Sequence, residues 1–230
     1  MRVNILYYPN IPMNTTLILT STVNVNYGKW FLHQKDKQER LDIYLKSIRQ
    51  WLDKSNFNII VVDNSGYSYD ELNEEKAKYE NRFEVVSFVE SEVEDAKYLE
   101  GNTSKGASEM FAIDYAFRHT RIIQPHHFII KITARYFIPE LEEYLGGYDL
   151  STYDSLTQEN RDRCEMVGCH YNKFTSVFKP YLITSGGWYD GHVENIWKER
   201  TSMCDNILVC KEFAIEETRR GGVNETFVNI

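Results

Sequence analysis

Two short stretches decide the fold: FIIKITARY at residues 128–136 and VVDNSG at residues 61–66. Each begins as an apolar, β-branched run and turns polar at its carboxyl end. This pattern is typical of buried parallel strands that deliver polar side chains to the ligand crevice of an open α/β sheet. One stretch ends on cations and a hydroxyl, and the other on a carboxylate and an amide. The pair suits a ligand with a hydrogen-bonding base and a negative charge, such as a nucleotide diphosphate-sugar.

Further strands and helices follow outward from these two stretches. At the two stretches we expect strands at 59–62 and 128–133, and apolar runs at 17–23 and 84–89 predict two more. Apolar residues at helical spacing predict helices over 36–54 and 106–119, and the charged segment 69–82 is typical of a solvent-facing helix. Alternating strands and helices indicate a mostly parallel sheet with right-handed crossovers and with helices on its faces.

The last third of the chain has a different pattern. It holds a short apolar segment at 164–171, a predicted helix near 193–200 and a short strand near 207–212. We expect a smaller, mixed part of the sheet there. No repeat or Pro-rich linker divides the chain. The prediction is one domain over 1–230, with a nucleotide-binding half over about 15–140 and a substrate half over about 141–230.

Composition excludes some classes of function. Lys and Arg number 26 against 34 Asp and Glu, a net charge of −8, which argues against broad nucleic-acid binding. No apolar run approaches the roughly 20 residues of a membrane span. The four cysteines show neither C-x-x-C spacing nor a histidine cluster for zinc. We therefore expect a soluble, cytoplasmic protein without a transmembrane segment.

The KITARY segment gives the strongest argument from single residues. On a strand, Lys131, Thr133 and Arg135 share one face because side chains alternate. Burying two cations on one side of an apolar strand is costly unless an anion compensates. A bound anion is one solution. In the alternative, Arg135 already lies outside the strand and Lys131 pairs with a structural carboxylate.

Two other polar segments are candidates for ligand contact. Asp63 and Asn64 follow a buried strand, where a carboxylate can bind a base or ribose, although Asp-Asn-Ser-Gly is also a good turn sequence. Lys105 and Gly106 open a helix, where free N–H groups attract anions. The order Lys-Gly excludes a P-loop, which needs Gly-Lys-Ser/Thr. A capped helix start with an incidental lysine remains the alternative.

The C-terminal third adds two more groups. Arg219 and Arg220, beside Gly221-Gly222, suit a loop that closes over phosphates or a plain exposed basic turn. Asp190 and Glu194 are potential acid/base groups, while each alone also suits a helix amino terminus.

Four features together resemble the nucleotide-diphospho-sugar glycosyltransferases of the GT-A fold, over about residues 17–140. They are the strands at 17–23 and 61–66, the Lys105-Gly106 helix start and FIIKITARY. The resemblance implies that Ser21, Thr22 and Asp63 contact the nucleoside, and that Arg40 contacts the base or a phosphate. It also implies acceptor binding by the second half, with Asp190 or Glu194 activating the acceptor hydroxyl. The implied diphosphate contacts are Lys105, Lys131, Arg135, Arg219 and Arg220.

Most enzymes of this class carry an Asp-x-Asp metal site near the end of the fourth strand, and this chain has no Asp-x-Asp. Lys131 and Arg135 stand about where it is expected, so Mn²⁺ or Mg²⁺ is possible but not supported, and no cofactor is required. A fixed positive charge stabilises a leaving diphosphate much as a metal does. The expected function is transfer of a sugar from a nucleotide-diphosphate donor to a glycan or glycoconjugate acceptor, in polysaccharide biosynthesis.

Two alternatives stay open. A non-catalytic protein of the same fold would bind a nucleotide-sugar or a glycan without turning it over. A dehydrogenase is disfavoured because no G-x-G-x-x-G follows the first strand.

Overall fold

The computed structural model describes residues 14–26, 28–30, 32–159, 164–220 and 225–230. Its centre is a seven-stranded sheet with the order β3-β2-β1-β4-β6-β5-β7, and a separate pair, β8 and β9, forms a small antiparallel sheet. The strands are β1 Thr15–Ser21, β2 Asn58–Asp63, β3 Phe83–Ser87, β4 Phe128–Thr133, β5 Ser155–Gln158, β6 Met166–His170, β7 Ile207–Cys210, β8 Ala214–Arg219 and β9 Thr226–Asn229.

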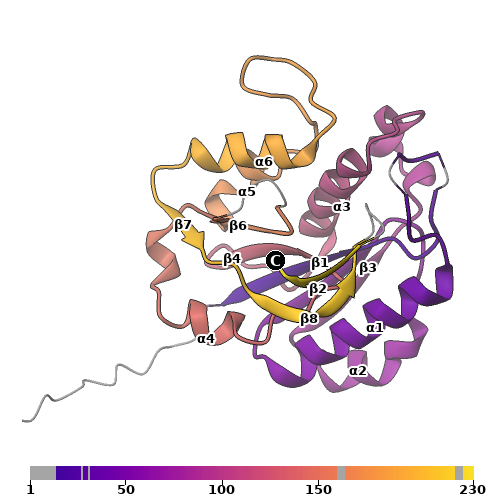
Figure 1. Ribbon diagram of the computed structural model, residues 1–230, viewed down its shortest axis with the longest axis horizontal. Coiled ribbons are helices and arrows are strands. Elements are labelled where there is room, and N and C mark those ends of the chain that lie inside the picture. The colour runs from indigo at the N-terminus through magenta and orange to yellow at the C-terminus, as the bar shows by residue number, and fades with distance from the viewer. Residues whose placement is uncertain (1–13, 27, 31, 160–163, 221–224) are drawn as a thin grey trace, which may run out of the picture.

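Helices cover both faces of this sheet (Figure 1). Helix α1 packs on one face, and α3, α5 and α6 pack on the other. The helices are α1 Lys37–Lys54, α2 Asn73–Lys78, α3 Lys105–His119, α4 Leu141–Leu145, α5 Phe174–Val177 and α6 Val193–Ser202. No helix of the described residues is both long and apolar enough to cross a bilayer.

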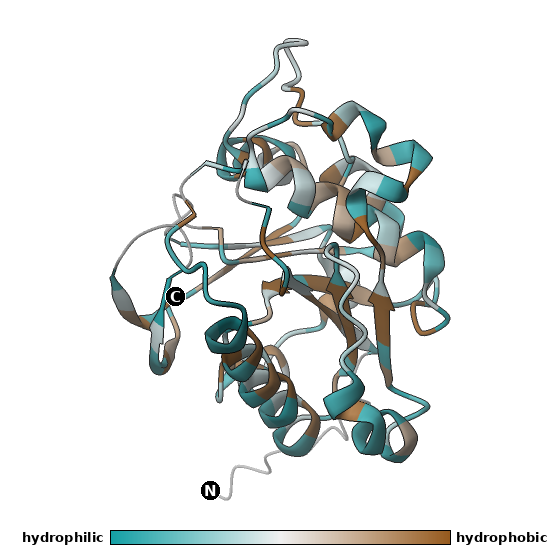
Figure 2. Ribbon diagram, turned by 90° about the vertical axis from the view of Figure 1, so that its right-hand side faces the viewer, coloured by the Kyte–Doolittle hydropathy of each residue, from teal (hydrophilic) through white to brown (hydrophobic). Residues whose placement is uncertain are grey.

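The apolar runs form the core of the sheet. The strands β1, β2 and β4 are almost entirely buried, and Figure 2 shows strongly hydrophobic ribbon between the helical layers. Residues alternate between the two faces: Leu17 and Leu19 face α1, whereas Ile18 faces α3. Burial on both faces explains why the sequence shows continuous apolar runs.

The predicted α/β class with a mostly parallel sheet is confirmed. β1 pairs in parallel with both β2 and β4, and β2 pairs in parallel with β3. The predicted mixed part is confirmed as well, because β6 pairs antiparallel with β4 and β5. The sheet therefore runs through both halves of the chain without interruption.

Several elements differ from the sequence prediction. The segment 69–82 holds only a short 3-10 turn and the six-residue helix α2, after a buried Tyr69 in a left-handed conformation with φ 53°. The strand β5 was not predicted, because its sequence SLTQ is mostly polar although every residue is buried. The hairpin β8–β9 and the short helices α4 and α5 also lack a clear periodic signal.

Candidate functional site

The carboxyl ends of β1, β2 and β4 lie side by side at one edge of the sheet. Ser21 at the end of β1 is in register with Asp63 of β2, and Thr20 is in register with Thr133 of β4. The two polar stretches therefore flank β1 from either side. In open α/β sheets this edge is where ligands bind.

Asp63 uses its carboxylate within the fold. It is fully buried and accepts hydrogen bonds from Ser21 Oγ at 3.0 Å and from the backbone of Val23 at 3.0 Å. It also accepts from the backbone and hydroxyl of Ser65, at 2.8 and 2.5 Å, and from the backbone of Tyr67 at 3.3 Å. Asp63 and Ser21 thus join the loops after β1 and β2 and present no open acceptor to a ligand in this structure.

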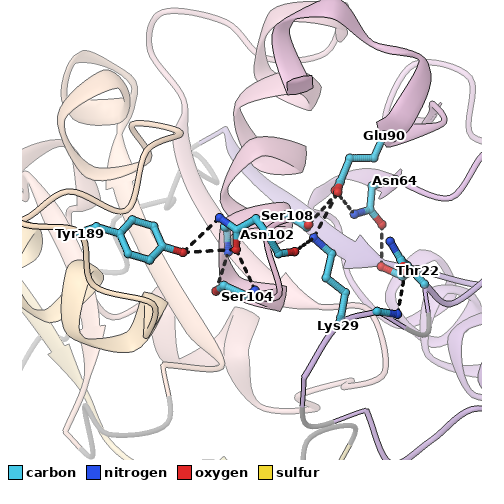
Figure 3. Close-up of polar contacts among 11 residues, drawn as sticks. Thr22, Lys29, Asn64, Glu90, Asn102, Ser104, Ser108 and Tyr189 are labelled. Atoms are coloured by element: carbon cyan, nitrogen blue, oxygen red, sulfur yellow. Dashed lines mark hydrogen bonds and ion pairs between the residues drawn. The ribbon is translucent and has the colours of Figure 1, made fainter. Parts of the chain in front are cut away.

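Thr22 and Asn64 belong to a network that joins three strand ends to α3 (Figure 3). Thr22 Oγ1 donates to Asn64 Oδ1 at 2.6 Å, and Asn64 Nδ2 donates to Glu90 Oε2 at 2.9 Å. Glu90 also accepts from Ser108 Oγ at 2.9 Å and forms an ion pair with Lys29 at 3.4 Å. These side chains hold the β1 loop against the start of α3.

Arg40 holds the same β1 loop from the other side. This buried guanidinium donates to the Thr22 carbonyl at 2.7 Å, to the Gln34 carbonyl at 3.1 Å and to Tyr44 Oη at 2.8 Å. Three contacts within the fold make Arg40 a residue that shapes the loop over the strand ends.

Lys131 is buried beneath α3 and α6. Its side chain is 2% exposed, and its ammonium lies 2.9 Å from Glu109 Oε1 and 4.6 Å from the centre of the Trp197 ring. Thr20 Oγ1 donates to the same Glu109 oxygen at 2.6 Å. Burial raises the pKa of Glu109, but the charge of Lys131 and these hydrogen bonds outweigh that effect and lower it. The compensating anion of Lys131 is therefore a structural carboxylate, which is the alternative given above.

Arg135 does not share the face of Lys131, so that expectation is wrong. The strand β4 ends at Thr133, and Arg135 lies in the turn that follows. Its Nη1 lies 3.3 Å from Gln34 Oε1 and 3.3 Å from the Arg219 carbonyl. It lines a small cavity between α1 and β8. Burial lowers the pKa of Arg135, while neighbouring phenol and carboxylate groups outweigh this and raise it.

The end of β4 also contacts the C-terminal hairpin. Thr133 Oγ1 donates to Glu165 Oε2 at 3.3 Å, and Arg220 Nε lies 3.1 Å from Glu165 Oε1. Arg219 forms an ion pair with Glu39 at 3.2 Å. Arg220, which follows β8, thus reaches the end of β4 through Glu165, whereas the side chain of Arg219 pairs with a carboxylate of α1. The neighbouring Gly221-Gly222 lies outside the described residues.

Lys105 stands at the first position of α3, after the N-cap Ser104. Burial lowers the pKa of its ammonium, and the positive charges of Arg135 and Arg40 lower it further. The carboxylates of Glu109 and Glu194 act in the opposite direction without cancelling this effect. Lys105 therefore lies in a positive electrostatic environment, at a helix terminus whose N–H groups also favour anions.

Gly106 serves helix packing. A Cβ at this position would lie 2.5 Å from Val193 Cβ, so only glycine lets the first turn of α3 approach the start of α6 this closely. The contact brings Glu194, in the first turn of α6, into electrostatic range of Lys105. Asp190 instead accepts from the His192 backbone at 2.8 Å and from Asn195 Nδ2 at 3.0 Å, so it stabilises the entry to α6.

Sequence reasoning missed Glu109 and Glu165 as site residues. Glu109 lies one helical turn after Lys105, so this spacing already placed both on one face of a helix that starts at the strand ends. Glu165 precedes a strand whose pairing partner the sequence does not reveal. Among the described residues, no group of three His, Cys, Asp or Glu side chains is placed to hold a metal ion.

No protein-family model matches the sequence, and no curated protein matches it. Among solved structures, the glycosyltransferase GlyE of Streptococcus pneumoniae aligns over 86% of this chain and 45% of its own, with a TM-score of 0.51 at 7% identity. A candidate nucleotide-diphospho-sugar transferase from Desulfovibrio desulfuricans aligns over 86% and 80%, with a TM-score of 0.46 at 13% identity. TarS of S. aureus aligns over 86% of this chain and 58% of its own, with a TM-score of 0.45 at 12% identity. The chain has the GT-A-like fold predicted from its sequence, and at these identities the likeness concerns the fold alone.

Proposed function

We propose that this protein transfers a sugar from a nucleotide-diphosphate donor to a glycan or glycoconjugate acceptor. The observation that carries the proposal is the gathering of Lys105, Arg135 and Arg220 around the carboxyl ends of β1 and β4. These cations come from three separate parts of the chain. Their convergence at the ligand edge of a GT-A-like sheet supports a site for a diphosphate.

The charges around β4 support binding of an anion. Lys131 is neutralised by Glu109, and Arg220 by Glu165. Burial is the first cause of the lowered pKa of Lys105, and repulsion by the guanidinium of Arg135 is the second. A diphosphate between them would relieve this repulsion and could accept from the guanidinium fork of Arg135.

In this proposal the residues at the end of β4 act without a divalent metal. Two carboxylates at this end of β4 already form ion pairs: Glu109 lies 2.9 Å from Lys131, and Glu165 lies 3.1 Å from Arg220. A metal ion would have to displace those cations. In this proposal Lys105 and Arg135 stabilise the negative charge that develops on the leaving nucleotide diphosphate.

Glu194 is the better of the two candidate bases. It lies in the first turn of α6 within electrostatic range of Lys105, whereas both carboxylate oxygens of Asp190 are bound to the start of α6. We assign Glu194 the removal of a proton from the acceptor hydroxyl if the sugar is inverted. Asp190 is assigned the positioning of the α6 entry.

A thermal-shift screen with UDP, GDP, ADP, CDP and their common sugar conjugates, with EDTA present, tests the proposal. We expect one nucleotide series to raise the melting temperature and to bind saturably in calorimetry. The absence of any shift and of any saturable binding across the panel would overturn the proposal.

A binding protein without turnover is the second candidate. Three cations of the site already pair with carboxylates, namely Lys131, Arg219 and Arg220, and this favours a site that holds its ligand without assisting departure of the leaving group. Release of free nucleotide from a bound nucleotide-sugar separates the two candidates. Tight binding with neither hydrolysis nor transfer would identify the non-catalytic function.

A further inference from the structure

The loop between α5 and α6 exposes large aromatic side chains. Trp188 is 73% exposed, Tyr189 55% and Tyr181 47%, and the loop projects beyond α6 (Figure 1). Residues 181–189 form a hairpin closed by a bridge between Ile183 and Tyr189, and we name it the aromatic hairpin. Exposed indole and phenol rings on a projecting element are typical of binding surfaces.

Helix α6 holds the aromatic hairpin in place. The guanidinium of Arg200 donates to the carbonyls of Lys179 at 2.7 Å and Tyr181 at 2.5 Å. Glu199 Oε1 accepts from both the backbone and the hydroxyl of Ser185, at 3.1 and 2.5 Å. The hairpin thus bonds to α6 through its backbone. Trp188 stays mostly in solvent, while Tyr181 also packs against Tyr98 with ring centres 4.6 Å apart.

The tip of the hairpin is shaped around the indole of Trp188. Gly187 has φ +83°, a left-handed conformation that favours glycine. At Gly186, a Cβ would lie 2.9 Å from Trp188 Nε1, so the indole lies directly against the glycine backbone. A ring that is already held in one place loses less conformational entropy on binding than a mobile ring does.

Charge indicates a neutral ligand. The sequence of the aromatic hairpin, YLITSGGWY, contains no Lys, Arg, Asp or Glu. The whole chain carries −8, which disfavours nucleic acids and anionic lipid surfaces. Sugar rings combine apolar C–H faces with hydroxyl edges, so they match aromatic rings that lie beside amide and hydroxyl groups.

The aromatic hairpin is continuous with the proposed donor site. Tyr189 Oη lies 3.2 Å from Asn102 Nδ2 (Figure 3). Ser104 Oγ donates to the Gly191 carbonyl at 2.7 Å. Asn102 and Ser104 lead directly into Lys105 at the start of α3. A chain stacked on the hairpin would therefore have one end beside Lys105 and Glu194.

We propose that the aromatic hairpin binds the acceptor as a neutral glycan chain stacked on Trp188 and Tyr189. This inference rests on the proposed function, because it places the acceptor next to the donor diphosphate. It assigns Gly186 and Gly187 to holding the indole in place, and Arg200 and Glu199 to fixing the hairpin on α6.

Calorimetry with soluble, neutral hexasaccharides of glucose, N-acetylglucosamine and galactose tests the inference. We expect at least one of them to bind saturably and Trp188→Ala to weaken its affinity about tenfold or more. Gly186→Ala keeps every ring but displaces the indole, so it should weaken affinity about threefold to tenfold. Tyr148→Ala, which removes an exposed ring next to α4, is the matched control and should bind as wild type.

Melting temperatures of all variants show whether they are folded, and nucleotide affinity is measured in parallel. Unchanged nucleotide affinity with lost oligosaccharide affinity in Trp188→Ala supports the inference. The inference is overturned if no hexasaccharide binds, if Trp188→Ala binds as wild type, or if Trp188 governs self-association or vesicle binding instead. Nucleotide binding without oligosaccharide binding refutes only this inference, whereas Trp188-dependent oligosaccharide binding without nucleotide binding refutes only the proposed function.

Discussion

The ends of β2 and β4 look alike in sequence and differ in the structure. At the end of β2, the carboxylate of Asp63 is fully buried and bonded to hydroxyl and backbone groups of the neighbouring loops. At the end of β4, the charged groups of Lys131 and Arg135 contact side chains from α3 and the β1 loop and a backbone carbonyl of β8. The polar group at the end of β2 thus bonds only within the neighbouring loops, whereas the charges at the end of β4 connect several elements.

This difference separates structural from ligand-binding polar residues. A buried polar group whose bonds are all made by its own loops fixes the loops. A charge that faces other charges from distant elements leaves an electrostatic imbalance that a ligand can relieve. By this criterion Asp63 shapes the site, and Lys105 and Arg135 are the proposed ligand contacts.

The largest expected effect is on stability at the β2 end. Asp63→Ala leaves several buried donors without an acceptor, so we expect a loss of about 3–5 kcal/mol in the free energy of unfolding. Urea denaturation measures it, with the exposed Asp70→Ala as control. A loss under about 1 kcal/mol would contradict the structural role of Asp63.

The buried pair at the β4 end gives the next effect. Lys131→Met leaves Glu109 charged and unpaired, which should cost about 2–3 kcal/mol because the carboxylate is partly exposed. The double variant with Glu109→Gln should recover a large part of this loss. A double-mutant cycle in urea shows the coupling. Additive losses would mean that the pair does not interact.

Ligand affinity should respond at Arg135. Arg135→Met removes a cation of the proposed diphosphate site, and we expect nucleotide affinity to fall about tenfold to thirtyfold, or about 1.4–2 kcal/mol. Calorimetry measures the affinity, and Arg118→Met, on the outer part of α3, serves as the control. Equal affinities of wild type and Arg135→Met would place the diphosphate elsewhere.

The smallest expected effect is a pH dependence of binding through Lys105. Its pKa is lowered from 10.5 by burial first and then by the guanidinium groups nearby. The protonated form binds an anion better, so nucleotide affinity should fall severalfold as the pH rises from neutral through this lowered pKa. Lys105→Met should lose that dependence. If the nucleotide affinity of the wild type rises with pH, the result contradicts the proposed role of the Lys105 charge.

Much of the fold could be predicted because its central strands are continuous apolar runs. The bounds of β4 agree with the prediction over 128–133, whereas β5, with the sequence SLTQ, is buried by its neighbours and carries no periodic signal. The prediction for Arg135 failed because the alternation of strand side chains was extended past Thr133, the last residue of β4.

The location of the candidate site could be predicted from the sequence, but the hydrogen-bond and ion-pair partners of its residues could not. The carboxyl ends of parallel strands meet wherever the sheet forms, so Lys131, Lys105 and Asp63 were found at one edge. Their partners depend on tertiary contacts that sequence spacing does not encode: Glu109 crosses from α3, and Val23 and Ser65 come from loops. The turn that leads into Trp188 likewise depends on the left-handed backbone conformation of Gly187.

The most direct test compares a nucleoside diphosphate with its nucleoside by calorimetry in the presence of EDTA, for the base that the screen selects. The account predicts that the diphosphate binds at least about thirtyfold more tightly than the nucleoside, and that the Lys105→Met/Arg135→Met double variant abolishes this difference. Equal affinity for the two ligands in wild type, or binding that EDTA abolishes, would contradict the claim that these cations bind the diphosphate.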